Sequence, residues 1–413
     1  MRVFAVFCLL LAPVVYAEER TPQQLFQDAK VAYDRHDYAA YLGVMETLHA
    51  MRPSHPIVGA NYAGALALSS RADDAVAQLR RLAAMQIAID LSDHDFDSLR
   101  GREDFRDVER RIAAVRTAVV RSDTKEIRIP QKDLITEAIA WDRKGKAFLV
   151  SANRKRKIIK VDLAGRVTDF ATDGIWGANG LGIDEQRRIV WATSSPSARA
   201  EGFEEAKDAK SELVALDLDS GAVTARYTIP DDGQKHFLDD LTVADDGTVY
   251  VSDSTGMMFR LRPKSAALEQ FVPRGTMRSP QGSAMGRGAL YVADYGGGIW
   301  RVDPATGGAK LLETPNDLVT FGIDGLEYRD GSLVAVQNGV EPNRVVRLWL
   351  DAAGRRVTRW KVIEANHPLM DEPTIGTFVG SDFWLVAASQ GNKFDTKKTE
   401  LLHDAVLLRI RVK

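Results

Sequence analysis

Residues 178–184 are Ala-Asn-Gly-Leu-Gly-Ile-Asp, and five other short segments repeat this pattern of one polar side chain before an apolar strand. The six polar positions are Glu137, Asn179, Asp239, Gln281, Asp324 and Glu372. Their spacing is nearly uniform, apart from a longer step between Asn179 and Asp239. A period of about 45 residues, with several strands per repeat, is typical of a β-propeller. The sequence therefore predicts six blades over residues 124–413.

Further strands follow within each repeat, separated by turn residues. Residues 245–254 (Asp-Asp-Gly-Thr-Val-Tyr-Val-Ser-Asp-Ser) and 287–295 (Arg-Gly-Ala-Leu-Tyr-Val-Ala-Asp-Tyr) are successive copies of one such unit. The last repeat ends on its third strand at residues 405–412, whereas residues 125–130 form a spare strand before the first repeat. We expect the spare strand to complete the sixth blade, because this closes the ring and covers an exposed edge.

The second repeat is longer than the others. Its extra segment, residues 197–210, is rich in Ala, Glu and Lys and lies between the second and third strands. This composition fits either a lid over one face of the propeller or a solvated insertion.

Residues 18–120 have helical rather than strand-like patterning. Segments 37–51 and 71–85 align with each other, which places Leu48 with Leu82 and Met51 with Met85. The offset between them matches the helical period of about 34 residues that is typical of tetratricopeptide repeats, which the region resembles. The fold class expected is thus multidomain, with N-terminal tetratricopeptide-like helical repeats followed by a six-bladed β-propeller.

The helical domain has two possible roles. A final helix, beginning near Phe96 and running to about residue 119, would cap the open end of the stack. The stack then either offers a groove for a protein partner, near Tyr33, Tyr41 and Tyr62, or only packs beside the propeller.

The N-terminus has the features of a secretory signal peptide. Arg2 precedes an apolar stretch over residues 3–15, and residues 15–17 (Val-Tyr-Ala) fit a cleavage site. The stretch is too short to span a bilayer. We therefore predict a signal peptide over residues 1–17, a periplasmic or secreted protein, and no membrane insertion after cleavage. Cys8 is the only cysteine, so the cleaved chain would hold no disulfide and no thiol nucleophile.

Composition and charge narrow the range of partners. The chain has 413 residues, of which 45% are hydrophobic and 27% charged, and its net charge is −2. These values are typical of globular proteins with room for two domains. A near-neutral chain lacks the basic character of a nucleic-acid-binding protein, so we expect no nucleic-acid partner.

The repeated polar positions indicate a metal site. In a propeller the residue before each innermost strand faces the central channel, so the six side chains should form a ring. Four carboxylates in a confined channel repel one another strongly. A divalent cation offsets this repulsion, and oxygen ligands favour calcium over zinc. We therefore predict that Glu137, Asn179, Asp239, Gln281, Asp324 and Glu372 bind Ca²⁺ or another divalent cation.

An alternative without metal explains part of the ring. Asn-Gly and Asp-Gly pairs are good turn formers, which accounts for Asn179 and Asp324. It accounts poorly for Glu137 and Glu372, because Glu is a weak turn residue. Glu372, which precedes Pro373, could instead form a salt bridge within the closing blade.

Three features resemble the senescence marker protein/gluconolactonase superfamily, which includes lactonases related to paraoxonase. They are the segment 179–184, the repeated Tyr-Val-x-Asp strands and Glu137 at the start of the first blade. The resemblance covers residues 124–413 and implies a channel calcium or other divalent ion bound by Glu137, Asn179 and Asp324. Asp239 and Gln281 depart from the family pattern, although both keep oxygen ligands.

Candidate catalytic residues lie close to the ring in sequence. His236 precedes Asp239 by three residues and His367 precedes Glu372 by five, so both should reach the channel mouth. Either histidine, or Asp240, could deprotonate a water molecule while the metal polarises a carbonyl group. Serine nucleophile chemistry is not expected, because no nucleophile-elbow motif surrounds Ser194 or Ser195.

Two functions follow from these observations. The first is an exported, divalent-metal-dependent hydrolase whose substrate is a small-molecule lactone or ester. The second is a non-catalytic protein, in which the propeller and the helical repeats bind a protein or small-molecule partner.

Overall fold

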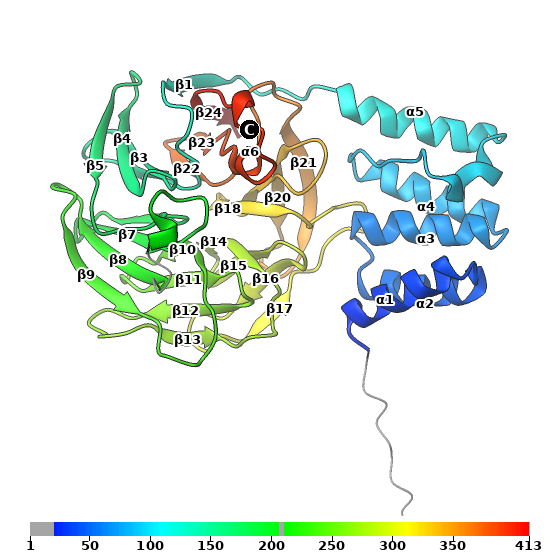
Figure 1. The fold of residues 1–413 in the computed structure, drawn as a ribbon, viewed down its shortest axis with the longest axis horizontal. Helices are drawn as coiled ribbons and strands as arrows, with labels where there is room; N and C mark the ends of the chain where they lie inside the picture. Colours follow the sequence, from blue (N-terminus) through cyan, green and yellow to red (C-terminus); the bar gives the residue numbers. More distant parts are fainter. Residues whose placement is uncertain (1–19, 206–209, 413) are drawn as a thin grey trace, which may run out of the picture.

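The computed structural model describes residues 20–205 and 210–412, which form a helical part and a β-propeller (Figure 1). The predicted signal peptide, residues 1–17, lies outside the described residues. Within the described residues, no helix combines the length and apolar character needed to cross a membrane.

The helical part comprises α1 (Pro22–Asp34), α2 (Tyr38–Met51), α3 (Pro56–Leu68), α4 (Ala72–Ala84), the 3-10 helix η1 (His94–Leu99) and α5 (Glu103–Thr117). Helices α1 and α3 begin at equivalent positions of the internal repeat, and so do α2 and α4. Prolines at the first position of α1 and α3 favour these starts, because their missing amide hydrogen has no role there. That the helices are tetratricopeptide repeats stays a prediction. The final helix begins at Glu103, because residues 94–99 form the 3-10 helix instead.

The tyrosines expected to line a groove make contacts within the helical part. Tyr41 is buried, the hydroxyl of Tyr33 donates to Asp95 at 2.7 Å, and Tyr62 stacks on His49 at 4.8 Å. Tyr33 and Tyr62 remain partly exposed, so a groove near them stays a prediction. Recruitment of a protein partner stays a prediction.

The described residues of the propeller form six four-stranded antiparallel sheets. Blade one contains β2 (Ile139–Asp142), β3 (Ala147–Ala152), β4 (Lys157–Asp162) and β5 (Val167–Ala171). Blade two contains β6 (Leu181–Asp184), β7 (Ile189–Ser194), β8 (Glu212–Asp217) and β9 (Val223–Thr228), with the 3-10 helix η2 (Phe203–Glu205) in its insertion. Blade three contains β10 (Leu238–Val243), β11 (Val249–Asp253), β12 (Met257–Leu261) and β13 (Glu269–Val272).

Blade four contains β14 (Pro280–Gly286), β15 (Ala289–Asp294), β16 (Gly298–Val302) and β17 (Ala309–Leu311). Blade five contains β18 (Ile323–Arg329), β19 (Ser332–Gln337), β20 (Arg344–Leu350) and β21 (Val357–Ala365). Blade six contains β22 (Gly376–Val379), β23 (Asp382–Val386), β24 (Ala405–Arg411) and β1 (Lys125–Ile129), with α6 (Gly391–Asp395) and η3 (Thr399–Leu401) between β23 and β24. Apolar side chains of neighbouring blades pack against each other and form the core.

Strand β1 closes the ring, as expected from the sequence. It pairs antiparallel with β24, with Lys125 opposite Arg409 and Ile129 opposite Ala405. Ile127 and Ile129 are buried on the core side of this strand, whereas Arg128 between them is exposed. The alternation fixes the register, because a shift of one residue would move both isoleucines out of the core.

The glycines that follow three ring residues allow the inner strands to approach one another. A Cβ atom on Gly180 would lie 2.7 Å from the carbonyl oxygen of Asp239, and one on Gly282 would lie 2.5 Å from that of Asp324. Neither glycine has a positive φ angle, so neither is required by a turn. The Asn-Gly and Gln-Gly pairs are therefore explained by close packing around the channel, not by turn formation.

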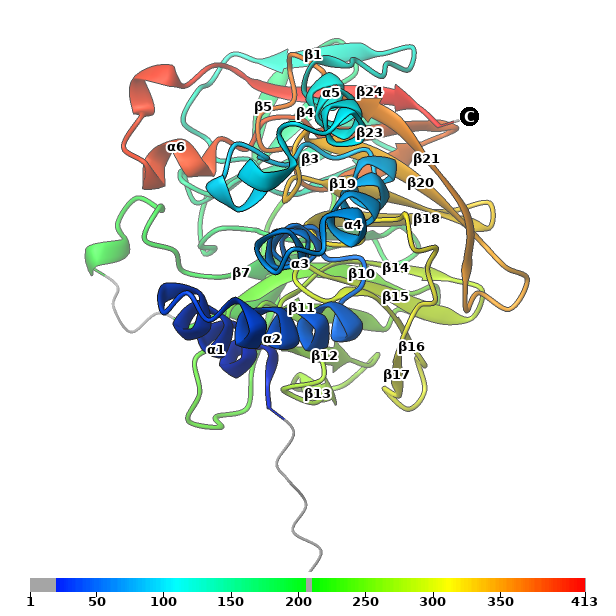
Figure 2. The ribbon, with the colours of Figure 1, turned by 90° about the vertical axis from the view of Figure 1, so that its right-hand side faces the viewer.

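The helical part covers the end of the propeller where the ring residues lie. Arg52 donates to the carbonyl of Gly296 at 3.1 Å, the amide of Ala88 donates to that of Glu341 at 2.6 Å, and Asn366 donates to that of Val115 at 2.9 Å. The propeller residues involved belong to loops at the same end as the starts of the inner strands. Figure 2, viewed from the helical side, shows the helices in front of the blades, with α3 and α4 near the middle.

Candidate functional site

The six predicted ring residues line a single cavity of about 260 Å³. Each stands at or just before the innermost strand of its blade, as the repeat predicts. The cavity therefore brings together side chains from all six blades, which lie far apart in the sequence.

The carboxyl groups of the cavity disfavour one another's charge. Burial, followed by the charges of Asp324 and Glu372, raises the pKa of Glu137 well above its ordinary value. Burial, followed by the charge of Asp324, does the same to the pKa of Asp239. Burial also raises the pKa of Asp324 to about 6. A bound cation would oppose these shifts, because it favours the ionised form of each carboxyl group.

Hydrogen bonds from the closing blade fix the two glutamates of the ring. The Oε1 atom of Glu137 accepts from the hydroxyl of Ser389 at 2.9 Å. The Oε2 atom of Glu372 accepts from the amide of Asn392 at 3.0 Å. Glu372 has a φ of 62°, a left-handed conformation that is costly for this residue type and marks functional sites. The alternative role of Glu372 within the closing blade thus takes the form of a hydrogen bond rather than a salt bridge.

A second set of cavity residues was missed at the sequence level. Asn153, Tyr295 and Asn338 line the cavity, and each follows the second strand of its blade directly. Asn153 donates to the Oδ1 atom of Asn179 at 2.6 Å. The sequence repeat could have indicated these residues. When the second strands of the blades are aligned, Asn153, Tyr295 and Asn338 occupy the same position, directly after the strand.

This second set also orients a ring carboxylate. The hydroxyl of Tyr295 donates to the Oδ1 atom of Asn338 at 2.9 Å, and the amide group of Asn338 donates to Asp324 Oδ2. The chain of donors occupies one carboxylate oxygen of Asp324. Its other oxygen is then held in a fixed direction, as ligands of bound metals usually are.

His236 does not reach the cavity, contrary to expectation. Its Nδ1 atom lies 2.6 Å from Asp253 and its Nε2 atom 3.0 Å from Asp232, and its side chain is 9% exposed. Asp253 also accepts from the amides of Phe237 and Thr255. The carboxylates thus engage both ring nitrogens of His236, which holds the loop leading into blade three.

His367 and Asp240 are also placed outside the cavity. His367 lines a separate hollow of about 660 Å³, where its Nδ1 atom accepts from the amide of Leu369 at 3.1 Å. Asp240 does not line the cavity, and its Oδ2 atom accepts from the amide of Ser283 in the next blade at 3.2 Å. Burial raises the pKa of Asp240 to about 8. The expectation that these residues act beside the ring is therefore corrected.

The insertion of blade two contributes a cation to the cavity wall. Arg199 lines the cavity and is bound through its guanidinium to Asp395 of α6, with Nε at 2.9 Å from Oδ1. The insertions of blades two and six therefore meet above the ring. Ser197, Arg199 and Ala200 of this segment line the cavity, and that the segment acts as a lid stays a prediction.

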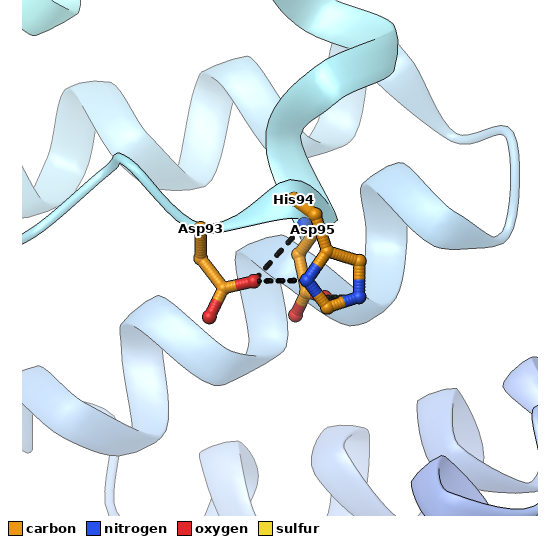
Figure 3. Close-up of side chains that lie close together, drawn as sticks. All are labelled: Asp93, His94 and Asp95. Carbon is orange, nitrogen blue, oxygen red and sulfur yellow. Dashed lines mark hydrogen bonds and ion pairs between the residues drawn. The ribbon is translucent and has the colours of Figure 1, made fainter.

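One tight group of acidic residues and histidine lies elsewhere. Within the described residues, Asp93, His94 and Asp95 are the group of three potential metal ligands whose atoms lie within 4.8 Å of one another (Figure 3). Asp93 and His94 are largely exposed, and Asp93 accepts from the amide of Asp95 at 3.2 Å, which caps η1. This group stabilises the start of η1. The channel carboxylates are spread more widely than these three residues.

Solved structures of other proteins share the fold that surrounds this cavity. Regucalcin from Agrobacterium tumefaciens, described as a calcium-binding protein, is 14% identical with a TM-score of 0.51, covering 70% of this chain and 95% of its own. The allergen Mala s 1 from Malassezia sympodialis is 16% identical with a TM-score of 0.54, covering 69% and 95%. A gluconolactonase from Xanthomonas campestris is 15% identical with a TM-score of 0.48, covering 71% and 97%.

The first two of these likenesses show a six-bladed β-propeller and, at such low identity, the fold alone. No protein-family model matches the chain. The search of curated proteins also finds no match.

Proposed function

We propose that this protein hydrolyses lactones or esters at a divalent cation held in the channel. The observation that carries the proposal is the convergence of six oxygen-bearing ring residues on one cavity, where burial and mutual repulsion raise the pKa of three carboxyl groups. A cation would relieve this repulsion. The similarity to regucalcin, described as a calcium-binding protein, is consistent with the choice of metal.

The residues present fit a hard cation. Carboxylate and amide oxygens are the ligands that calcium prefers, and its coordination tolerates their wide spacing with water filling the remaining positions. Glu137, Asp239 and Asp324 would supply charge, and Asn179 and Gln281 neutral oxygens. Glu372 is already held by the amide of Asn392, so it would contribute through its other oxygen.

When bound, the cation supplies a Lewis acid for the carbonyl oxygen of the substrate. A water molecule attacks the carbonyl carbon, the acyl C–O bond breaks, and the products are a carboxylate and an alcohol, which stay joined when the substrate is a lactone. Since neither histidine reaches the cavity, a ring carboxylate takes the proton of the water and passes it to the leaving oxygen, which becomes the alcohol. The chain of Tyr295 and Asn338 keeps Asp324 in place during this step.

The proposed cellular location rests on the N-terminal sequence. We propose that the protein is exported through the signal peptide of residues 1–17 and acts in the periplasm or outside the cell.

A metal analysis followed by an activity panel tests this function. Purified protein should contain a divalent cation and should hydrolyse at least one member of a lactone and ester panel, with activity lost to chelator and restored by calcium. Asp324→Ala should abolish both metal and activity, whereas Asp245→Ala, a residue outside the cavity, should change neither. A protein that holds its metal but hydrolyses nothing would instead favour a non-catalytic binding protein.

A further inference from the structure

The geometry points to Arg199 as a specificity-determining residue that selects lactones or esters carrying a carboxylate group. This inference rests on the proposed function, because it assigns a substrate class to the same cavity. It concerns the part of the substrate that lies against the insertion of blade two.

The position of Arg199 in the cavity is the first argument. Among the described residues that line the cavity, Arg199 is the one cationic side chain. It comes from the insertion of blade two, whereas the acidic ring residues come from the starts of the inner strands. A substrate with its reacting carbonyl at the ring can therefore place a second group against the guanidinium.

The orientation of the guanidinium is the second argument. Its Nε and Nη2 atoms donate to the carboxylate of Asp395, which fixes one edge of the group. The carbonyl of Arg199 accepts from Arg154 Nη1 at 3.1 Å, which holds the main chain. Nη1 of Arg199 makes no hydrogen bond to any residue that the structure describes, and a guanidinium has five N–H donors in all. The arrangement leaves donors for a ligand and holds them in advance.

The chemistry of those donors is the third argument. Arginine binds carboxylate through paired, charge-assisted hydrogen bonds, which are roughly twice as strong as neutral ones. A cavity of about 260 Å³ admits only a small molecule. The expected substrate class is thus a small lactone or ester that carries a carboxylate in addition to its reacting carbonyl.

Two matched pairs of probes test the inference. The first pair is pyroglutamate and pyroglutamide, cyclic lactams that resist hydrolysis and differ only in having a carboxylate or a carboxamide, measured by calorimetry with calcium present. The second pair is γ-carboxy-γ-butyrolactone and its carboxamide, measured by hydrolysis. Wild-type protein should prefer the carboxylate of each pair by about 10- to 100-fold, the value of a hydrogen bond to a charged group. Arg199→Gln should remove the preference by weakening the carboxylate alone, and Arg199→Lys should retain part of it.

Two further variants separate this role from a purely structural one. Arg226→Gln is the matched control, because Arg226 belongs to the same blade and pairs with Glu212 but does not line the cavity. Asp395→Asn weakens the ion pair between the two insertions while keeping the guanidinium. Arg226→Gln should preserve the preference for carboxylate, and Asp395→Asn should lower it only in part, because the guanidinium keeps its charge but loses the partner that orients it. If Asp395→Asn causes the same loss as Arg199→Gln, the arginine only joins the insertions and the inference is overturned.

The outcomes also distinguish this inference from the proposed function. Hydrolysis of both lactones at equal rates overturns the role of Arg199 and leaves the hydrolase in place. Selective binding of pyroglutamate that depends on Arg199, without hydrolysis of any lactone or ester, supports carboxylate recognition and overturns the hydrolase. Equal, weak binding of both lactams by the wild-type protein contradicts the inference directly.

Discussion

Arg344 in blade five donates a hydrogen bond from Nη1 to the main-chain carbonyl of Met85, at 3.0 Å. The same atom donates to the carbonyl of Gln86 at 2.8 Å, and Nε donates to Gln337 at 2.8 Å. Met85 is the C-cap of α4, so the buried cation lies at the negative end of the helix. The helical part is thereby fixed to the start of β20 in blade five.

Arg344→Met should loosen the attachment of the helical part. It removes the donor to the buried carbonyl of Met85 and to the part-buried carbonyl of Gln86, and we expect the free energy of unfolding to fall by about 3 kcal/mol. Urea denaturation measures the loss, and hydrogen exchange should show faster exchange in α3 and α4. Arg359→Met, which removes an exposed arginine from the same blade, is the control. Unchanged exchange in the helices would contradict an anchoring role.

The closing strand should be needed for propeller stability. Ile129 is fully buried in β1, and Ile129→Ala should lower the free energy of unfolding by about 2–5 kcal/mol, because it leaves a cavity between the first and last blades. Arg128→Ala, at the neighbouring exposed position, should have little effect. Thermal unfolding followed by circular dichroism provides the comparison. Equal melting temperatures for the two variants would argue against closure by β1 in solution.

Calcium should stabilise the folded protein. A ligand that binds only the folded state at about 100 times its Kd adds about 2.7 kcal/mol of stability, and here it also relieves repulsion among the ring carboxylates. The melting temperature should rise with calcium and fall with chelator. Glu137→Gln should reduce the rise, because it removes one charge from the ring. A melting temperature indifferent to both additions would count against a channel cation.

The stability of the metal-free protein should decrease with rising pH. Burial raises the pKa of Glu327 in the folded state to about 8, from an ordinary value near 4.5. The folded state thus holds the proton more tightly than the unfolded state, so this contribution is complete below about pH 4.5 and is lost as the pH rises through about 8. Glu327→Gln should flatten the pH dependence of unfolding relative to the exposed control Glu313→Gln. Parallel profiles for the two variants would refute this assignment.

His236→Ala should affect stability rather than catalysis. It removes the partner of the buried Asp253 carboxylate, which should cost about 1–3 kcal/mol. The value of kcat should stay near that of the wild type, instead of the roughly 100-fold loss expected for a general base. Urea denaturation and steady-state kinetics on one preparation test both statements. A large loss of kcat at unchanged stability would contradict this prediction and indicate a catalytic role for His236.

His236 and Asn338 show which features of the site the sequence does not predict. His236 and Asp239 are close neighbours in the chain, yet the histidine faces Asp253 and Asp232, because a loop can direct successive side chains to different partners. Asn338 directly follows one of the aligned strands. The sequence does not show that its side chain bonds to Asp324, because Asp324 lies on another strand of the same blade. Proximity in sequence predicts the loop that holds a residue, and it does not predict the direction of the side chain.

The sequence by itself determined the six repeats, the ring of polar residues before the inner strands and the strand that closes the last blade. These follow from local periodicity and turn chemistry, which each segment carries independently of the others. Only the tertiary structure placed Arg199 against Asp395, which is distant in the sequence, and set the helices over the end of the channel. Such contacts arise when the ring closes and its insertions pack together, and no local pattern in either partner specifies them.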